Sequence, residues 1–311
     1  YFARMTTDAL LSGSMSGDPL WAGQITYYGS NWSLTGVAVP FFTPQRIDDQ
    51  MKAILAAENP QAKMVLDAIE GTKKPQGFGK GSELALRAET QLAGFDLQAS
   101  FFTGFEPLPG LEMALTIQEI PGLGPMPVPS VQGTYRRVNF LGVAAAGTIG
   151  DVGVWGELAY GGPASFDEAD HPSELARVPL SVNERYLQAV LGAHYTLPVG
   201  KGLLAQAQYI YRGQGSLLSP YVLPNLETME PGEVEGAHYL YGRLGYDFSP
   251  GSSLELVVLH GFSEKGGILR PAYTHRFPNA MQLELSLIRP YGEGAFASLG
   301  TQARLALSYP F

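Results

Sequence analysis

The last part of the chain, residues 297–311, constrains the fold most. It reads ASLGTQARLALSYPF, and every second residue from Leu299 to Phe311 is apolar or neutral, whereas Gln302, Arg304 and Ser308 lie between them. Successive side chains of a β-strand point to opposite faces. The pattern therefore predicts a strand with one apolar and one polar face, close to the carboxyl terminus.

Alternation of the same kind recurs along the whole chain and predicts an all-β fold. We expect fourteen strands, at residues 1–14, 20–29, 31–42, 82–92, 96–105, 134–148, 151–160, 185–198, 203–213, 237–248, 253–263, 268–277, 280–289 and 297–311.

The connections between these strands are sorted by length. Six alternate connections are short and contain turn-forming residues, whereas the connections 43–81, 106–133, 161–184 and 214–236 are long. Outer-membrane β-barrels alternate short periplasmic turns with longer external loops. We therefore expect an antiparallel transmembrane β-barrel of about 14 strands, with both termini on the periplasmic side.

Composition excludes several other classes. A run of about 18 apolar residues, the signature of a transmembrane helix, is absent from the sequence. Charged residues make up 16%, below the roughly 25% of soluble domains. The net charge of −9 argues against general nucleic-acid binding, and the absence of cysteine excludes disulfides and thiolate chemistry.

Two segments resemble known families. The end of the chain resembles the closing strand of Gram-negative outer-membrane β-barrels, whose terminal residues are a signal for the barrel-assembly machinery; the matching residues are Leu305, Leu307, Tyr309 and Phe311. Residues 31–46, NWSLTGVAVPFFTPQR, follow QITYYG and resemble the alginate-export-like porins and related outer-membrane porins. Strands precede this segment in that family, so the resemblance implies 16 or more strands if N-terminal strands are missing here.

Charged side chains recur at alternate positions of the predicted strands, on one face. In a strand that crosses lipid, such side chains must be hydrated or form ion pairs with one another. The residues expected to line a pore are Arg87, Glu89, Arg137, Glu157, Arg212, Arg243, Arg270, Glu284 and Arg304. Two interpretations stay open: an open pore with a charged wall, or an ion-paired and plugged interior. The apolar side chains of Phe102, Trp155 and Leu204 share the inward parity.

Residues 47–70 show helical periodicity, interrupted at Asn59-Pro60, within the long connection 43–81. We expect this helical external loop either to constrict the pore or to pack on its rim.

Chemistry-bearing motifs are few. The five histidines do not show metal-ligand spacing, and we expect neither metal nor cofactor. His260 and His275 have the outward parity, but the sequence predicts no outward serine beside either, so we do not expect an enzyme.

We expect residues 1–311 to form a single outer-membrane channel domain, a porin for passive diffusion of small polar solutes. The alternatives are a scaffold barrel with a blocked or partner-filled lumen, and an exporter or uptake barrel for hydrophobic or polymeric compounds. Expected partners are outer-membrane lipid and lipopolysaccharide, the barrel-assembly machinery, and further copies or a periplasmic protein, but no nucleic acid.

Overall fold

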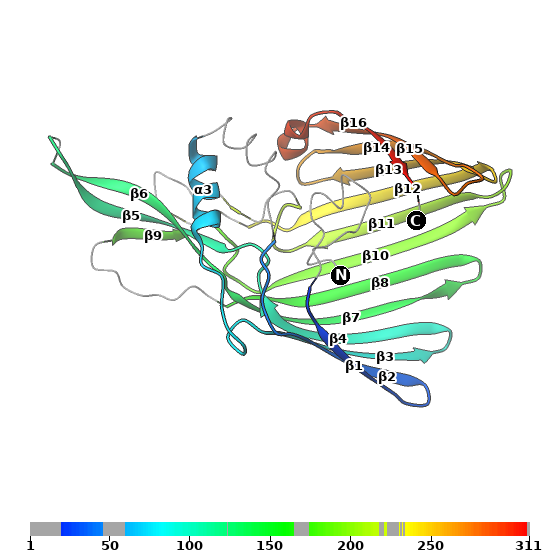
Figure 1. Ribbon diagram of the computed structural model, residues 1–311, viewed down its shortest axis with the longest axis horizontal. Coiled ribbons are helices and arrows are strands. Elements are labelled where there is room, and N and C mark those ends of the chain that lie inside the picture. The colour runs from blue at the N-terminus through cyan, green and yellow to red at the C-terminus, as the bar shows by residue number, and fades with distance from the viewer. Residues whose placement is uncertain are drawn as a thin grey trace.

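A large antiparallel sheet dominates the computed structural model (Figure 1). The structure describes residues 20–45, 60–122, 124–164, 174–217, 221–222, 230, 232 and 234–309. Thirteen strands form this sheet in the order β1-β2-β3-β4-β7-β8-β10-β11-β12-β13-β14-β15-β16. In the described part of the chain, β1 and β16 do not pair with each other, so the sheet is open at both edges.

The thirteen strands coincide with thirteen of the fourteen predicted ones. Their bounds are β1 Gly23–Tyr28, β2 Trp32–Val39, β3 Glu83–Leu92, β4 Phe95–Phe105, β7 Arg137–Ile149, β8 Val152–Pro163, β10 Tyr186–Leu197, β11 Leu203–Arg212, β12 Ala237–Ser249, β13 Ser252–Gly261, β14 Gly266–Arg276, β15 Gln282–Gly292 and β16 Gln302–Ser308. The predicted strand 1–14 lies outside the described residues, as does Phe311.

A second sheet was not predicted. The strands β5 (Gly110–Ile120), β6 (Gly124–Thr134) and β9 (Glu174–Pro179) form a three-stranded antiparallel sheet in the order β6-β5-β9. The long connections 106–133 and 161–184, in which no strand was predicted, therefore contain strands. β5 shows a two-residue period of its own, with Leu111 fully buried and Met113 nearly so.

Six short connections of the large sheet lie at one end, and the longer connections lie at the other end together with the four-residue turn 262–265 (Figure 1). The short connections are 29–31, 93–94, 150–151, 198–202, 250–251 and 277–281. In the turn 93–94, Ala93 and Gly94 both have positive φ (52° and 82°), which is the two-residue hairpin geometry that matches strand twist. We call these two ends of the sheet the turn end and the loop end.

The predicted helical loop contains one described helix, α3 (Pro60–Gly71), at the loop end. Val65 and Ile69 of α3 pack against the buried cluster of Leu111, Met113 and Leu180, and Val131 of β6 packs against the same cluster. The apolar side of the helix therefore packs against the three-stranded sheet, and α3 lies beside β5 and β6 (Figure 1). The preceding part of the predicted helix, 47–59, lies outside the described residues.

An ion-paired strut joins the two sheets. Arg136, just before β7, donates from Nε and Nη2 to the two carboxylate oxygens of Glu106, at 2.8 and 3.0 Å. The same guanidinium donates to Asn183 Oδ1 at 3.2 Å and to the Val182 carbonyl at 2.9 Å. Arg136 thus connects the three chain segments that lead between the sheets.

Candidate functional site

The two faces of the large sheet differ in chemistry. Directly opposite residues in neighbouring strands point to the same face, so the pairing register assigns every strand residue to one face. The face that carries Leu86, Leu141, Leu191, Leu244 and Leu305 we call the apolar face. These leucines are 43–70% exposed. The opposite face, with Arg243 and Arg270, we call the polar face.

The apolar face is exposed over the whole width of the sheet. Its large exposed side chains include Leu34 on β2, Val143 on β7, Leu158 on β8 and Leu254 on β13. Soluble monomers rarely expose contiguous apolar patches above a few hundred Å², and larger ones mark membrane or protein contact sites. A surface of this kind is typical of sites that contact lipid or protein.

Aromatic and histidine side chains concentrate at both ends of the apolar face. At the loop end, Tyr209 OH lies 2.6 Å from Nδ1 of His238, and His260 stacks on Tyr291 with a ring-centroid separation of 6.0 Å. At the turn end, Phe248, Tyr273, His275 and Phe277 form a chain of ring contacts with centroid separations of 4.4–6.5 Å, and Tyr27 contacts Trp32 at 5.5 Å.

On β12 the apolar face runs from His238 to Phe248. Ten residue steps span about 33 Å along a strand, which a tilt of about 40° reduces to a height of about 25 Å. The separation of the two aromatic bands thus matches the apolar band of a membrane barrel.

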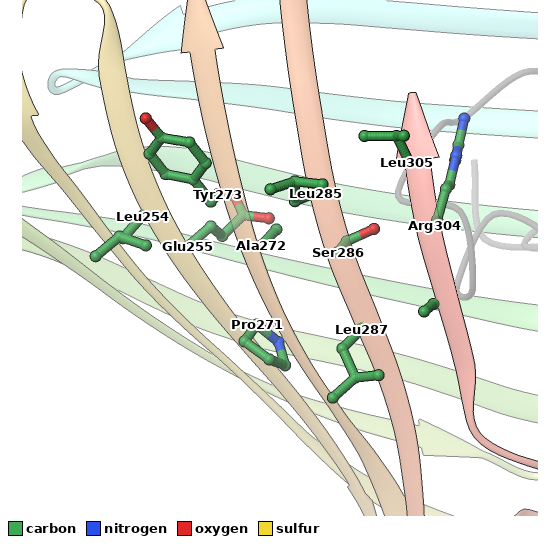
Figure 2. A pocket seen from close by; sticks show the side chains of 11 residues that line it. Leu254, Glu255, Pro271, Ala272, Tyr273, Leu285, Ser286, Leu287, Arg304 and Leu305 are labelled. Carbon is green, nitrogen blue, oxygen red and sulfur yellow. The ribbon is translucent and has the colours of Figure 1, made fainter. Parts of the chain in front are cut away.

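A shallow groove crosses the apolar face over β13–β16, with Leu254, Pro271 and Leu287 around it (Figure 2). The β14–β15 register skips two rungs, between the pairs Leu269↔Arg289 and Ala272↔Ser286. Pro271 lies in that gap, and proline has no N–H to donate. The groove therefore lies where two rungs of the β14–β15 ladder are missing, and its lining also includes Glu255, Ser286 and Arg304.

The polar face carries a charge ladder, defined here as Arg243, Glu255, Arg270 and Glu284 on β12, β13, β14 and β15. Nε of Arg243 donates to Glu255 Oε2 at 2.7 Å. Arg270 donates from Nη1 to Glu255 Oε1 and from Nη2 to Glu284 Oε1, both at 3.1 Å. The signs alternate across four strands and sum to zero, so the ladder does not impose a strong preference for anions or cations.

Part of the polar face is open to water. The side chains of Arg87 and Glu89 on β3 are paired at 3.3 Å and remain 44% and 39% exposed. Ser33 of β2 donates to the same Glu89 carboxylate at 3.3 Å. Arg243 is 38% exposed, whereas Arg270, in the middle of the ladder, is only 11% exposed.

The nine predicted site residues do not form one cluster. Arg243, Arg270 and Glu284 are brought together through Glu255, and Arg87 and Glu89 form a separate pair. Glu157, Arg212 and Arg304 also have the polar-face parity, on β8, β11 and β16.

The predicted position of Arg137 on the polar face is wrong. Arg137 pairs with Phe105 and shares the parity of Leu141, which places it on the apolar face. Its guanidinium lies 4.7 Å from the centroid of the Phe105 ring and donates to the Lys80 and Ser82 carbonyls, at 3.4 and 3.3 Å. A charge at a strand end is accommodated by loop backbone, so charge alone was a poor guide to its face.

A serine does lie beside an outward histidine, contrary to the prediction. Ser252 Oγ is 2.8 Å from His275 Nδ1, and the two residues are direct cross-strand partners. The predicted strand began one residue later, at 253, which left this partner out. Ser252 is buried, and the other described contacts of His275 are with the rings of Tyr273 and Phe277. The Ser252–His275 contact therefore links β13 and β14 at the turn end.

In the described residues, no cluster of three or more metal-ligating side chains occurs, and no helix is long and apolar enough to cross a membrane.

The loop end of the polar face is filled by an apolar cluster that the sequence did not reveal. It comprises Val190, Ile210, Ala237, Tyr239, Leu259, Ile268, Ile288 and Phe296. Phe296 belongs to a short 3-10 helix, η2 (Gly294–Leu299), in the connection between β15 and β16. The polar face is thus charged at mid-height and apolar near the loop end.

Comparison with known proteins does not add an identification: no family model matches the chain, and a search of curated proteins finds no relative.

Proposed function

We propose that this chain is an outer-membrane channel that lets small polar solutes diffuse past the polar face of its sheet. The observation that carries the proposal is the contrast between the two faces. An exposed apolar face bounded by two aromatic bands fits lipid, and a charge ladder on the opposite face fits water.

Strand dimensions support the proposal. The strands from β3 to β15 in the large sheet have 10–13 residues, and a membrane β-strand needs about 9–11 residues when tilted by about 45°. Backbone groups in lipid must be paired, so exposed edges cannot persist there. A membrane form of this sheet must therefore be closed.

Closure is compatible with the directions of the strands. All neighbours in the thirteen-stranded sheet are antiparallel, so β1 and β16 run in the same direction. One further strand would run antiparallel to both edges. The predicted strand 1–14 lies outside the described residues and remains our prediction for that strand. The resulting barrel would have both termini on the periplasmic side.

The scaffold with a blocked lumen is the second candidate. The apolar cluster around Phe296 occupies part of the polar face at the loop end, which favours a narrowed or closed passage. The exporter for hydrophobic compounds remains the weaker alternative, because Trp155 of the polar face packs against the apolar cluster around Phe296.

Single-channel conductance of the purified protein in a planar bilayer tests the proposal. The variants Arg243→Ala and Arg87→Ala remove positive charge from the polar face, and Leu244→Ala is the matched control on the apolar face of β12. We expect steady conductance of the native protein, a shift toward cation selectivity in both arginine variants, and native behaviour of the control. A folded native protein that never conducts would refute the channel.

A further inference from the structure

The connection 293–301 folds over the polar face of the sheet. It carries η2, and Phe296 on this element is fully buried. The ring packs in the cluster with Tyr239, Ile268 and Ile288. The pairing register places these three residues on the same face as the charge ladder. An external connection therefore contributes a buried side chain to the surface along which solute would pass.

A glycine shapes the seat of the Phe296 ring. Gly261 ends β13 on the polar face, and a Cβ at this position would lie 2.5 Å from Oε2 of Glu264, 3.0 Å from Cε1 of Tyr239 and 3.1 Å from Cε2 of Phe296. Such contacts are tighter than most real Cβ contacts. The missing side chain at Gly261 thus leaves the space in which the two rings pack.

Polar contacts hold two further connections at the same place. Tyr239 OH donates to Glu264 Oε1 at 2.8 Å and accepts the Leu217 N–H at 2.8 Å. Ser216 Oγ donates to the same Glu264 oxygen. Glu264 lies in the turn between β13 and β14, and Ser216 and Leu217 follow β11. Tyr239 is therefore the common anchor of the loop end.

We propose that the connection 293–301, seated by Phe296 against Tyr239 and Gly261, sets the size limit of the channel. This inference rests on the proposed channel function. The connection 293–301, and not the helical loop with α3, is then the constriction. The apolar side of α3 packs against the three-stranded sheet, whereas Phe296 lies directly on the polar face. Solutes would meet the seated connection first and the charge ladder after it.

Conductance and solute-size measurements test the size limit. Phe296→Ala removes the ring, and Gly261→Val fills its seat. Phe262→Ala is the matched control, because this neighbouring aromatic is 53% exposed. We expect both test variants to conduct more and to admit larger sugars into vesicles than the native protein, and the control to match it. A native size limit in a folded Phe296→Ala protein would overturn the proposal.

The cysteine-free chain allows an independent test of the seat. Leu299 packs on the cluster, and Thr301 in the same connection is exposed. We expect Leu299→Cys to react with a charged thiol reagent about tenfold more slowly than Thr301→Cys, the ratio given by a docking free energy of about 1.4 kcal/mol. Adding Gly261→Val should abolish the difference. Equal rates in the native background would contradict the seated connection.

The two readouts separate the possible failures. Slow reaction of the Leu299→Cys variant together with silence of every variant in the bilayer would leave the seat intact but refute both the channel and its size limit. Conductance with equal thiol reaction rates would retain the channel and refute the seat.

Discussion

Arg270 and Glu255 are diagonal neighbours on β14 and β13, with Nη1 and Oε1 3.1 Å apart, and the same guanidinium also binds Glu284. Arg270 is 11% exposed, so its removal leaves two partly buried carboxylates without their shared partner. Removing one partner of a buried ion pair costs about 3–5 kcal/mol.

We therefore predict that Arg270→Met lowers the free energy of unfolding by about 3 kcal/mol. Arg87→Ala, at a pair with 44% and 39% exposed side chains, should cost at most about 1 kcal/mol. Urea unfolding in detergent micelles measures both. Adding Glu255→Gln and Glu284→Gln to Arg270→Met should recover part of the loss, and equal costs for the two arginine variants would contradict this account of the ladder.

The strut between the sheets gives a second prediction. The side chain of Arg136 is 3% exposed, and its guanidinium donates four hydrogen bonds to the segments that connect the sheets. We expect Arg136→Ala to cost about 3–5 kcal/mol and to increase amide hydrogen exchange throughout β5 and β9. The control is Arg177→Ala, which removes a more exposed contact with Glu112 at 3.5 Å. Unchanged exchange in β5 and β9 would show that other contacts hold the small sheet.

Glu106 makes the stability of this strut depend on pH. Burial raises the pKa of the Glu106 carboxyl above its usual range, although the neighbouring Arg136 guanidinium opposes the shift. The folded protein then binds this proton more tightly than the unfolded chain does. Stability due to Glu106 must therefore fall as pH rises from the unfolded pKa, near 4.5, through the raised folded pKa.

We predict that Glu106→Gln reduces the rate at which the free energy of unfolding falls as pH rises. Urea unfolding of the native protein and the variant at a series of pH values above 4.5 gives the two slopes directly. Identical slopes would mean that protonation of Glu106 does not contribute to the pH dependence of the free energy of unfolding.

The large sheet was predictable because apolar residues occupy most positions on one face of each strand. The alternation of Leu283, Leu285 and Leu287 with Gln282, Glu284 and Ser286 is strong enough to place β15 without any neighbour. The three-stranded sheet was missed although β5 alternates as well. Its partner β6 contains Pro125, Pro127 and Pro129, and proline argues against a strand except at an edge, which is where β6 lies.

The candidate site was only partly predictable. Parity placed Arg243, Arg270 and Glu284 on one face, but their assembly through Glu255 depends on diagonal contacts between strands. Phe296 could not be assigned, because its burial depends on a connection that folds back onto the sheet and on the missing side chain of Gly261. The local periodicity of the sequence predicts neither the position of this connection on the sheet nor the space left at Gly261.

Two neighbouring residues on β11 test most directly whether the two faces of the sheet contact lipid and water. Gln206 lies on the polar face and Ala207 on the apolar face. Each is changed to cysteine in the cysteine-free chain, labelled with a fluorophore and reconstituted into vesicles. We predict quenching at 207 by brominated lipid and at 206 by iodide in water. Iodide quenching of both labels, with neither sensitive to the lipid, would contradict a membrane-spanning sheet.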